Sequence, residues 1–279
     1  MTKKQLIIDS AVQLFSERGI EATSVQQITD HCGISKGAFY LSFKSKEELV
    51  TSVIEHFMNN IIMKVDQAVN ATPNKEDKLL TYYVQTFTIL SEYTSFAEIL
   101  MKEKMAAISD DLIEKLHFFV ALSNENLIKI LFDVYGDQIK GKQFDLVMII
   151  NGMIQGYLSW IFEVRHPFDI VKLSQSLVEK TDLIATKSQL IFLEESAFIF
   201  TKYEQKPLQE YVDELQSMLD ETNGTIEKES LLLLIEELKL VEPRTAIILG
   251  LLSNLNNNEK FDWIKFLIRK QLSTKKVTK

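Results

Sequence analysis

The chain has 279 residues, of which 46% are hydrophobic and 25% are charged, and its formal net charge is −8. This is the composition of an ordinary soluble globular protein of one or two domains. The single cysteine, Cys32, excludes an internal disulfide, so nothing indicates an oxidising compartment. The chain has only nine glycines and four prolines, the residues that turns and sheet corners require, so we expect a mostly helical fold.

The negative charge is unevenly distributed along the chain. Residues 1–50 hold six basic and six acidic residues, whereas the remainder holds 25 basic and 33 acidic ones. Because an acidic surface repels phosphate, any contact with DNA is expected to be confined to a small N-terminal patch.

One apolar segment, Leu146 to Val164, is almost long enough to span a bilayer. It carries Asn151, Gln155 and Ser159, so we interpret it as a buried helix and expect no membrane contact. The N-terminus has neither the apolar run nor the cleavage site of a secretory signal, and a cytoplasmic location is expected.

The first fifty residues predict three short helices followed by a long one. A first helix is predicted from about Lys3 to Arg18, where Gly19 ends it. Ser24 and Gln27 form the pattern of a capping box at the start of a second helix. Further on, Gly33 suits a tight turn, Ser35 caps a third helix from Lys36 to about Leu41, and Ser45 and Glu48 suggest a second capping box. Capped helices joined by a glycine turn are typical of a helix-turn-helix.

The third helix has the residues that reading DNA requires. Gly37 and Ala38 are small and allow a close approach of the backbone to the major groove. Ser35, Lys36 and Tyr40 offer a hydroxyl, a cation and a phenol to phosphates or base edges. Phe39 and Phe43 are expected to face the core. The alternative is a helical hairpin whose polar residues only face solvent, but small residues on an exposed helix gain nothing from that arrangement.

The run TSVQQITDHCGISKGAFYLSFKSKEEL, from Thr23 to Leu49, resembles the signature of the tetracycline-repressor (TetR) family. The resemblance is dense over residues 3–50 and weak afterwards. It implies a dimer whose recognition helices enter the major grooves of a palindromic operator. The DNA contacts that it implies are Ser24, Ser35, Lys36, Gly37, Ala38, Tyr40 and Lys46. Family members commonly carry histidine where this chain has Ser42, so Ser42 is retained only as a hydroxyl contact without a charge.

Beyond the head, the apolar pattern predicts an all-α protein with a long linking helix from Lys46 to about Asn70. Further helices are predicted at 75–91, 95–107, 109–135, 143–165 and 168–185, then at 188–203, 207–221, 226–240, 244–255 and 259–272. The expected organisation is a helix-turn-helix DNA-binding domain at 1–46, a helical effector-binding and dimerisation domain at 47–187 and an additional helical extension at 188–279. The apolar run from Leu231 to Ile235 is expected to be buried.

The helical body offers candidate residues for a ligand cavity and for a dimer interface. The candidates for an apolar ligand pocket are Tyr83, Phe87, Phe118, Asn151, Gln155 and Trp160, although ordinary core packing explains any one of them. Gly152 and Gly156 form a small-residue pair that permits close helix approach. The segment resembles the penultimate helix of the TetR body, which implies a role in dimerisation.

Two functions are compatible with this pattern. The first is a homodimeric, ligand-responsive repressor, with double-stranded DNA, a second copy of itself and a partly apolar small molecule as partners. The alternative is a DNA-binding regulator controlled by a protein partner through the C-terminal extension. An enzyme is not expected, because the four histidines are scattered and no phosphate-binding loop is visible. No cofactor is expected, and His31 and Cys32 lack partners at metal-ligand spacing.

Overall fold

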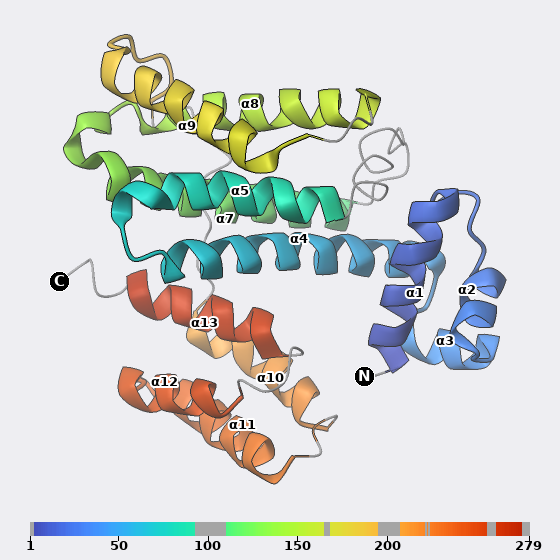
Figure 1. Ribbon diagram of the computed structural model, residues 1–279. Coiled ribbons are helices and arrows are strands. Elements are labelled where there is room, and N and C mark those ends of the chain that lie inside the picture. The colour runs from blue at the N-terminus through green and yellow to red at the C-terminus, as the bar shows by residue number, and fades with distance from the viewer. Residues whose placement is uncertain are drawn as a thin grey trace. The chain divides into compact units, whose positions relative to one another are not determined.

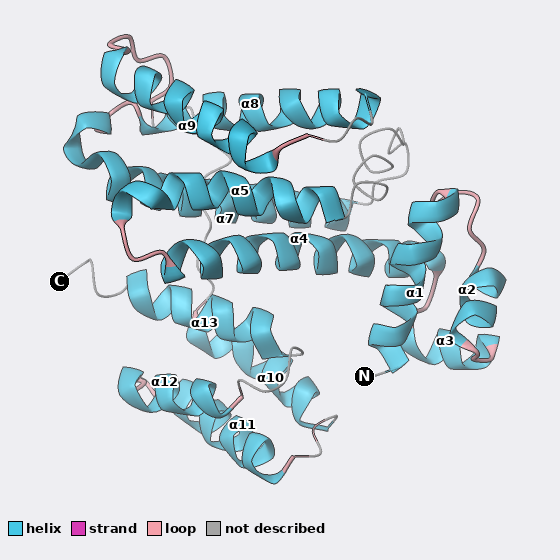
Figure 2. Ribbon diagram, in the orientation of Figure 1, coloured by secondary structure: helices cyan, strands magenta, loops and turns pink. Residues whose placement is uncertain are grey.

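The computed structural model describes residues 3–92, 110–164, 168–194, 207–220, 222, 224–255 and 261–274. Every regular element within these ranges is helical, which confirms the all-α expectation (Figures 1 and 2). The helix predicted at 95–107 lies outside the described residues. The chain divides into two compact units, Met1–Tyr203 and Glu204–Lys279.

Three short helices form the N-terminal head, namely α1 (Lys3–Arg18), α2 (Val25–Cys32) and α3 (Lys36–Ser42). Their predicted positions are confirmed to within a residue or two. Apolar side chains from all three meet in one small core, which contains the buried residues Ile7, Ala11, Leu14, Phe15, Ile28, Phe39 and Phe43. Because Phe39 and Phe43 turn inward as expected, the opposite side of α3 is exposed.

Helix α4 (Lys46–Ala71) leads from the head into the body of the first unit (Figure 1). At 26 residues it is roughly 39 Å long, from the usual rise per residue. It packs against α1 at one end and, along the body, against α5 (Lys78–Glu92) and α7 (Asp110–Tyr135). One continuous helix therefore contacts both the head and the body.

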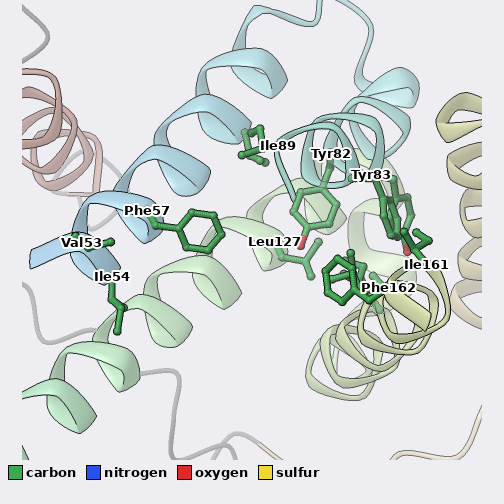
Figure 3. Close-up of a cluster of buried hydrophobic side chains, with 14 of the residues drawn as sticks. Val53, Ile54, Phe57, Tyr82, Tyr83, Ile89, Leu127, Ile161 and Phe162 are labelled. Atoms are coloured by element: carbon green, nitrogen blue, oxygen red, sulfur yellow. The ribbon is translucent and has the colours of Figure 1, made fainter. Parts of the chain in front are cut away.

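The rest of the body consists of α8 (Gln143–Val164) and α9 (Ile170–Lys187), with short 3-10 turns at Lys75–Asp77 and Gly136–Ile139. Helix α7 packs on α8, and α9 packs on both α5 and α8. Figure 3 shows part of the resulting core, in which Tyr82 and Tyr83 of α5 lie near Leu127 of α7 and near Ile161 and Phe162 of α8.

The helix predicted at 188–203 is wrong in its described part, because residues 188–194 are not helical. The carboxylate of Asp145, at the start of α8, accepts hydrogen bonds from the backbone N–H groups of Phe192 and Leu193, at 2.8 and 3.2 Å. These amides are thereby satisfied without a helix, which explains the difference.

The second unit contains a 3-10 turn at Leu208–Glu210 followed by α10 (Tyr211–Asp220), α11 (Thr225–Leu238), α12 (Thr245–Asn254) and α13 (Asp262–Thr274). Helix α11 packs on α10 and α12, and α12 packs on α13. The expectation that the whole run Leu231 to Ile235 is buried is wrong. Leu232 and Leu233 are 45% and 53% exposed, because helical periodicity turns them away from the buried face.

Candidate DNA-binding site

The turn between α2 and α3 has the geometry of a helix-turn-helix. Both halves of the predicted capping box at Ser24 are present, since its hydroxyl accepts from Gln27 N–H and Gln27 Oε1 accepts from Ser24 N–H at 2.7 Å. Gly33 ends α2 at φ 67°, ψ 31°, a left-handed conformation that favours glycine. The Ser35 hydroxyl then accepts from Ala38 N–H at 3.2 Å and starts α3. Local sequence thus fixes the angle between the two helices.

The outer face of α3 carries the predicted contacts. Lys36, Gly37 and Tyr40 are exposed, and Ala38 and Ser42 are half-buried beside them. The Tyr40 ring rests edge-on against Phe39, with the ring centroids 5.3 Å apart, so a buried aromatic residue orients the exposed phenol. This face offers a cation, a phenol and a stretch of bare backbone to a ligand outside the head.

The start of α4 borders the same face. The Ser45 hydroxyl accepts from Glu48 N–H at 3.2 Å, as predicted. The Glu48 carboxylate, however, accepts from Lys44 N–H at 2.7 Å rather than from Ser45, so the second predicted capping box is shifted by one residue. Lys46 donates to the Glu21 carbonyl at 3.4 Å, which holds its ammonium group beside the connection between α1 and α2.

One exposed residue of α3 was not among the predicted contacts. Leu41 is 89% exposed in the middle of the outward face. The exposure of Leu41 could have been predicted from the inward positions of Phe39 and Phe43, because the residue midway between two buried positions on a helix faces outward.

The predicted pocket residues are not gathered in one place. Tyr83 and Phe87 are fully buried, and the Tyr83 hydroxyl is hydrogen-bonded to Thr181 of α9 at 2.7 Å. Burial raises the pKa of the Tyr83 phenol above its ordinary value. Asn151 donates to Asn124 Oδ1 of α7 at 3.0 Å. Of the remaining three residues, Phe118 is half-buried, whereas Gln155 and Trp160 are exposed.

A cleft of about 180 Å³ lies elsewhere, between α4, α5 and α7. Its apolar walls include Ile62, Val65 and Ile130, and its polar lining includes Lys78, which forms an ion pair with Asp133 at 2.5 Å. None of the six predicted pocket residues lines this cleft. Side chains from three separate helices form it, so sequence spacing alone gave no signal for it.

The outward face of α8 is apolar and open. Gly152, Gly156 and Trp160 line a shallow hollow of about 370 Å³ on it. Among the described residues, α8 is the one helix long and apolar enough to cross a membrane by length and composition, and 33% of its most apolar stretch is buried within the chain. It packs against α7 and α9, as expected of a helix of the folded body.

Together, the capped helices, the left-handed glycine turn and the open face of α3 define a helix-turn-helix DNA-binding protein. Residues 7–53 match the family described as bacterial regulatory proteins, tetR family. The chain is similar to two uncharacterised HTH-type transcriptional regulators of Bacillus subtilis (strain 168). It is 28% identical to YuxN, covering 96% of this chain and 98% of YuxN, and 29% identical to YerO, covering 95% and 94%.

Among solved structures, the transcriptional regulator FadR from Bacillus subtilis, in complex with stearoyl-CoA, has the same fold over 67% of this chain and 100% of its own. The TM-score is 0.54 and the identity is 22%. Residues 7–53 therefore carry the N-terminal domain of the TetR family, and the chain over nearly its whole length is similar to bacterial HTH-type transcriptional regulators.

Proposed function

We propose that the protein is a homodimeric repressor that binds a palindromic operator through α3 and releases it when a small molecule binds the helical body. The observation that carries this proposal is the outer face of α3, where Lys36, Gly37 and Tyr40 are exposed on a helix that its buried neighbour Phe39 holds in place. A cytoplasmic location is part of this proposal, because a transcriptional regulator must reach DNA.

The contacts with DNA are tested on an operator selected from a random pool and examined for two-fold symmetry. Lys36→Ala and Tyr40→Ala should weaken operator binding without unfolding the head, because both side chains are exposed. Loss of the cationic contact from Lys36 should reduce the magnitude of the slope of log K against log salt by about 0.9, whereas loss of the uncharged Tyr40 phenol should leave that slope unchanged. The matched control is Lys140→Ala, an exposed lysine of the body. If the Lys36 and Tyr40 double variant bound like the wild type, the assignment of these contacts would be wrong.

Dimerisation is proposed to use the outward faces of α8 and α9. Exposed large apolar residues gather there, namely Met148, Ile149, Trp160, Val164, Val171 and Leu183. Exposed apolar patches are typical of interaction sites. At Gly152 and Gly156 an added Cβ would have no neighbour within 4 Å, so in the single chain both positions are open to an approaching helix.

Gly156→Glu places a charge on that face, at a position where an added Cβ has no neighbour within 4 Å. Sedimentation should show a larger fraction of monomer for Gly156→Glu, whereas Gly250→Glu, at an open position of α12, should leave the dimer intact. A Gly156→Glu protein as tightly dimeric as the wild type would place the interface elsewhere.

The effector is proposed to be a partly apolar small molecule. The complex of FadR with stearoyl-CoA makes a long-chain acyl-CoA thioester the first probe. A ligand coupled to operator binding should lower the affinity for the operator about 5- to 150-fold, the usual range of allosteric coupling.

Two variants test where the effector binds. Gln155→Ala tests the predicted pocket residues and Lys129→Ala tests the cleft between α4, α5 and α7, and both side chains are exposed. The variant that loses the response while keeping operator affinity locates the site.

Control by a protein partner is the less favoured candidate. The similar proteins are named as transcriptional regulators, and the fold neighbour carries a small molecule. Within the described part of 207–274, no observation requires a protein ligand instead.

A further inference from the structure

Leu41 is a large apolar residue with an exposed side chain near the end of α3. Its side chain is 89% exposed in the described structure, although a scattered exposed leucine would not by itself require an explanation. Leu41, however, lies four residues after Gly37, so the two share one face of α3. That face is opposite the buried Phe39, and therefore points away from the core of the head.

Gly37 marks this face as the one that another molecule approaches. Glycine is a poor helix former, and its backbone here is not in the left-handed region. A Cβ at position 37 would meet only Ser35 Oγ, at 3.8 Å, which is an ordinary contact. The folded chain therefore has no need for glycine at this position, and the missing side chain leaves room outside the chain directly beside Leu41.

The chemistry of leucine limits what it can recognise there. Its side chain has no hydrogen-bond donor or acceptor, so it cannot bind a phosphate or the polar edge of a base. The major groove presents one apolar group on a base edge, the C5-methyl group of thymine. Tyr40 is displaced by about 100° around the helix from Leu41, so the phenol can bind the backbone of the DNA while the leucine faces the bases.

We propose that Leu41 is a specificity-determining residue that packs against a thymine methyl group in each half-site of the operator. This inference rests on the proposed operator binding and adds a base preference to it. Covering one methyl-sized apolar group contributes about 0.8 kcal/mol, which corresponds to roughly fourfold in affinity at each contact.

The test uses the full-length protein and its selected operator. Each thymine in one half-site is replaced in turn by deoxyuridine, which keeps every hydrogen-bonding group and removes only the methyl group. The wild type should lose about fourfold in affinity at one or two of these positions and nothing at the others. Leu41→Ala should bind the parent operator more weakly and should be indifferent to deoxyuridine at the same positions.

Two controls separate this contact from other effects. Leu190→Ala removes an equally exposed leucine, 92% exposed, from the body and should keep the wild-type response to deoxyuridine. Tyr40→Phe should weaken binding while keeping that response.

A wild type indifferent to deoxyuridine at every thymine, or a Leu41→Ala protein with the full wild-type response, would overturn the inference while leaving operator binding standing. A wild type that selects no DNA sequence at all would instead overturn the proposed function, and this inference with it.

Discussion

Gly33, in the turn before α3, and Gly37, in the first turn of α3, differ in whether the fold requires glycine. Gly33 has φ 67°, where a side chain is strained, and the sequence pattern predicted a tight turn there. Gly37 has neither a positive φ nor a close neighbour, since a Cβ would lie 3.8 Å from Ser35 Oγ. The fold therefore requires glycine at position 33 but not at position 37.

Gly37→Ala should therefore separate stability from binding. We expect its thermal stability to be unchanged or slightly higher, because alanine stabilises a helix relative to glycine by about 0.5–1 kcal/mol. Operator binding should weaken by about 1–3 kcal/mol, the usual cost of forcing an extra methyl group into a packed contact. Thermal unfolding and titration with labelled operator measure the two effects.

The control for Gly37→Ala is Gly250→Ala, because Gly250 is also a helical glycine with nothing within 4 Å of an added Cβ. It should show the same small gain in stability with unchanged operator affinity. A Gly37→Ala protein that bound as well as the wild type would show that the backbone at this position does not approach DNA closely.

At the scale of elements, an ion pair joins α11 to α12. Glu237, whose side chain is 4% exposed, accepts from Arg244 N–H at 2.6 Å and from the guanidinium group through Nε and Nη2. Hydrogen bonds from the Arg244 side chain, followed by the one from its backbone, lower the pKa of the Glu237 carboxyl below its ordinary value of 4.5. Arg244 is also the N-cap residue of α12, so the pair stabilises the turn between the two helices.

A lowered pKa in the folded state means that the folded chain binds the Glu237 proton less tightly than the unfolded chain does. The stabilisation is complete above pH 4.5 and is lost as the pH falls through the lowered pKa. The difference in the free energy of unfolding between the wild type and Glu237→Gln should be constant near neutral pH and should shrink as the pH falls below 4.5. Glu236→Gln, at an exposed neighbouring position, is the control. A difference that did not change with pH would contradict the linkage.

The segment 188–194 depends on Asp145, which lies 47 residues away from Phe192. Asp145→Ala removes the acceptor for the amides of Phe192 and Leu193, so hydrogen exchange at these two amides should accelerate. The control is Asp169→Ala, which removes the N-cap of α9 and its bond from Lys172 N–H, and should leave Phe192 and Leu193 protected. Unchanged exchange at both amides in Asp145→Ala would show that the carboxylate does not hold the segment.

These elements show how far local sequence determines this protein. The head could be predicted nearly to the residue, because Ser24, Gln27, Gly33 and Ser35 act over at most four positions. The course of 188–194 could not, since it depends on a carboxylate far away in sequence. The same reason applies to the cleft, which combines residues from α4, α5 and α7. Periodicity alone, applied more strictly, would have shown that Leu232 and Leu233 turn outward.

At the scale of the whole molecule, the chain is longer than the FadR fold that it matches. FadR corresponds over its full length to 67% of this chain, whereas YuxN and YerO match 96% and 95% of it. Residues 204–279 form a compact unit whose described elements are helical, and the matches to YuxN and YerO extend into it.

Removing the second unit should show whether it takes part in sensing, provided that the cut respects the first unit. A cut after Lys187 deletes Ser188, whose carbonyl accepts from Lys142 Nζ at 3.2 Å, and both amides that Asp145 binds. Each group left unsatisfied by that cut should cost about 1–3 kcal/mol, less where water replaces the lost partner. A cut after Tyr203 keeps all of these contacts. We therefore expect 1–203 to unfold at a higher temperature than 1–187, with both measured at equal concentration because dimerisation contributes to stability.

If the effector binds the helical body, 1–203 should bind the operator and release it on addition of the effector as the full chain does. Operator binding by 1–203 without release would place the sensor in residues 204–279.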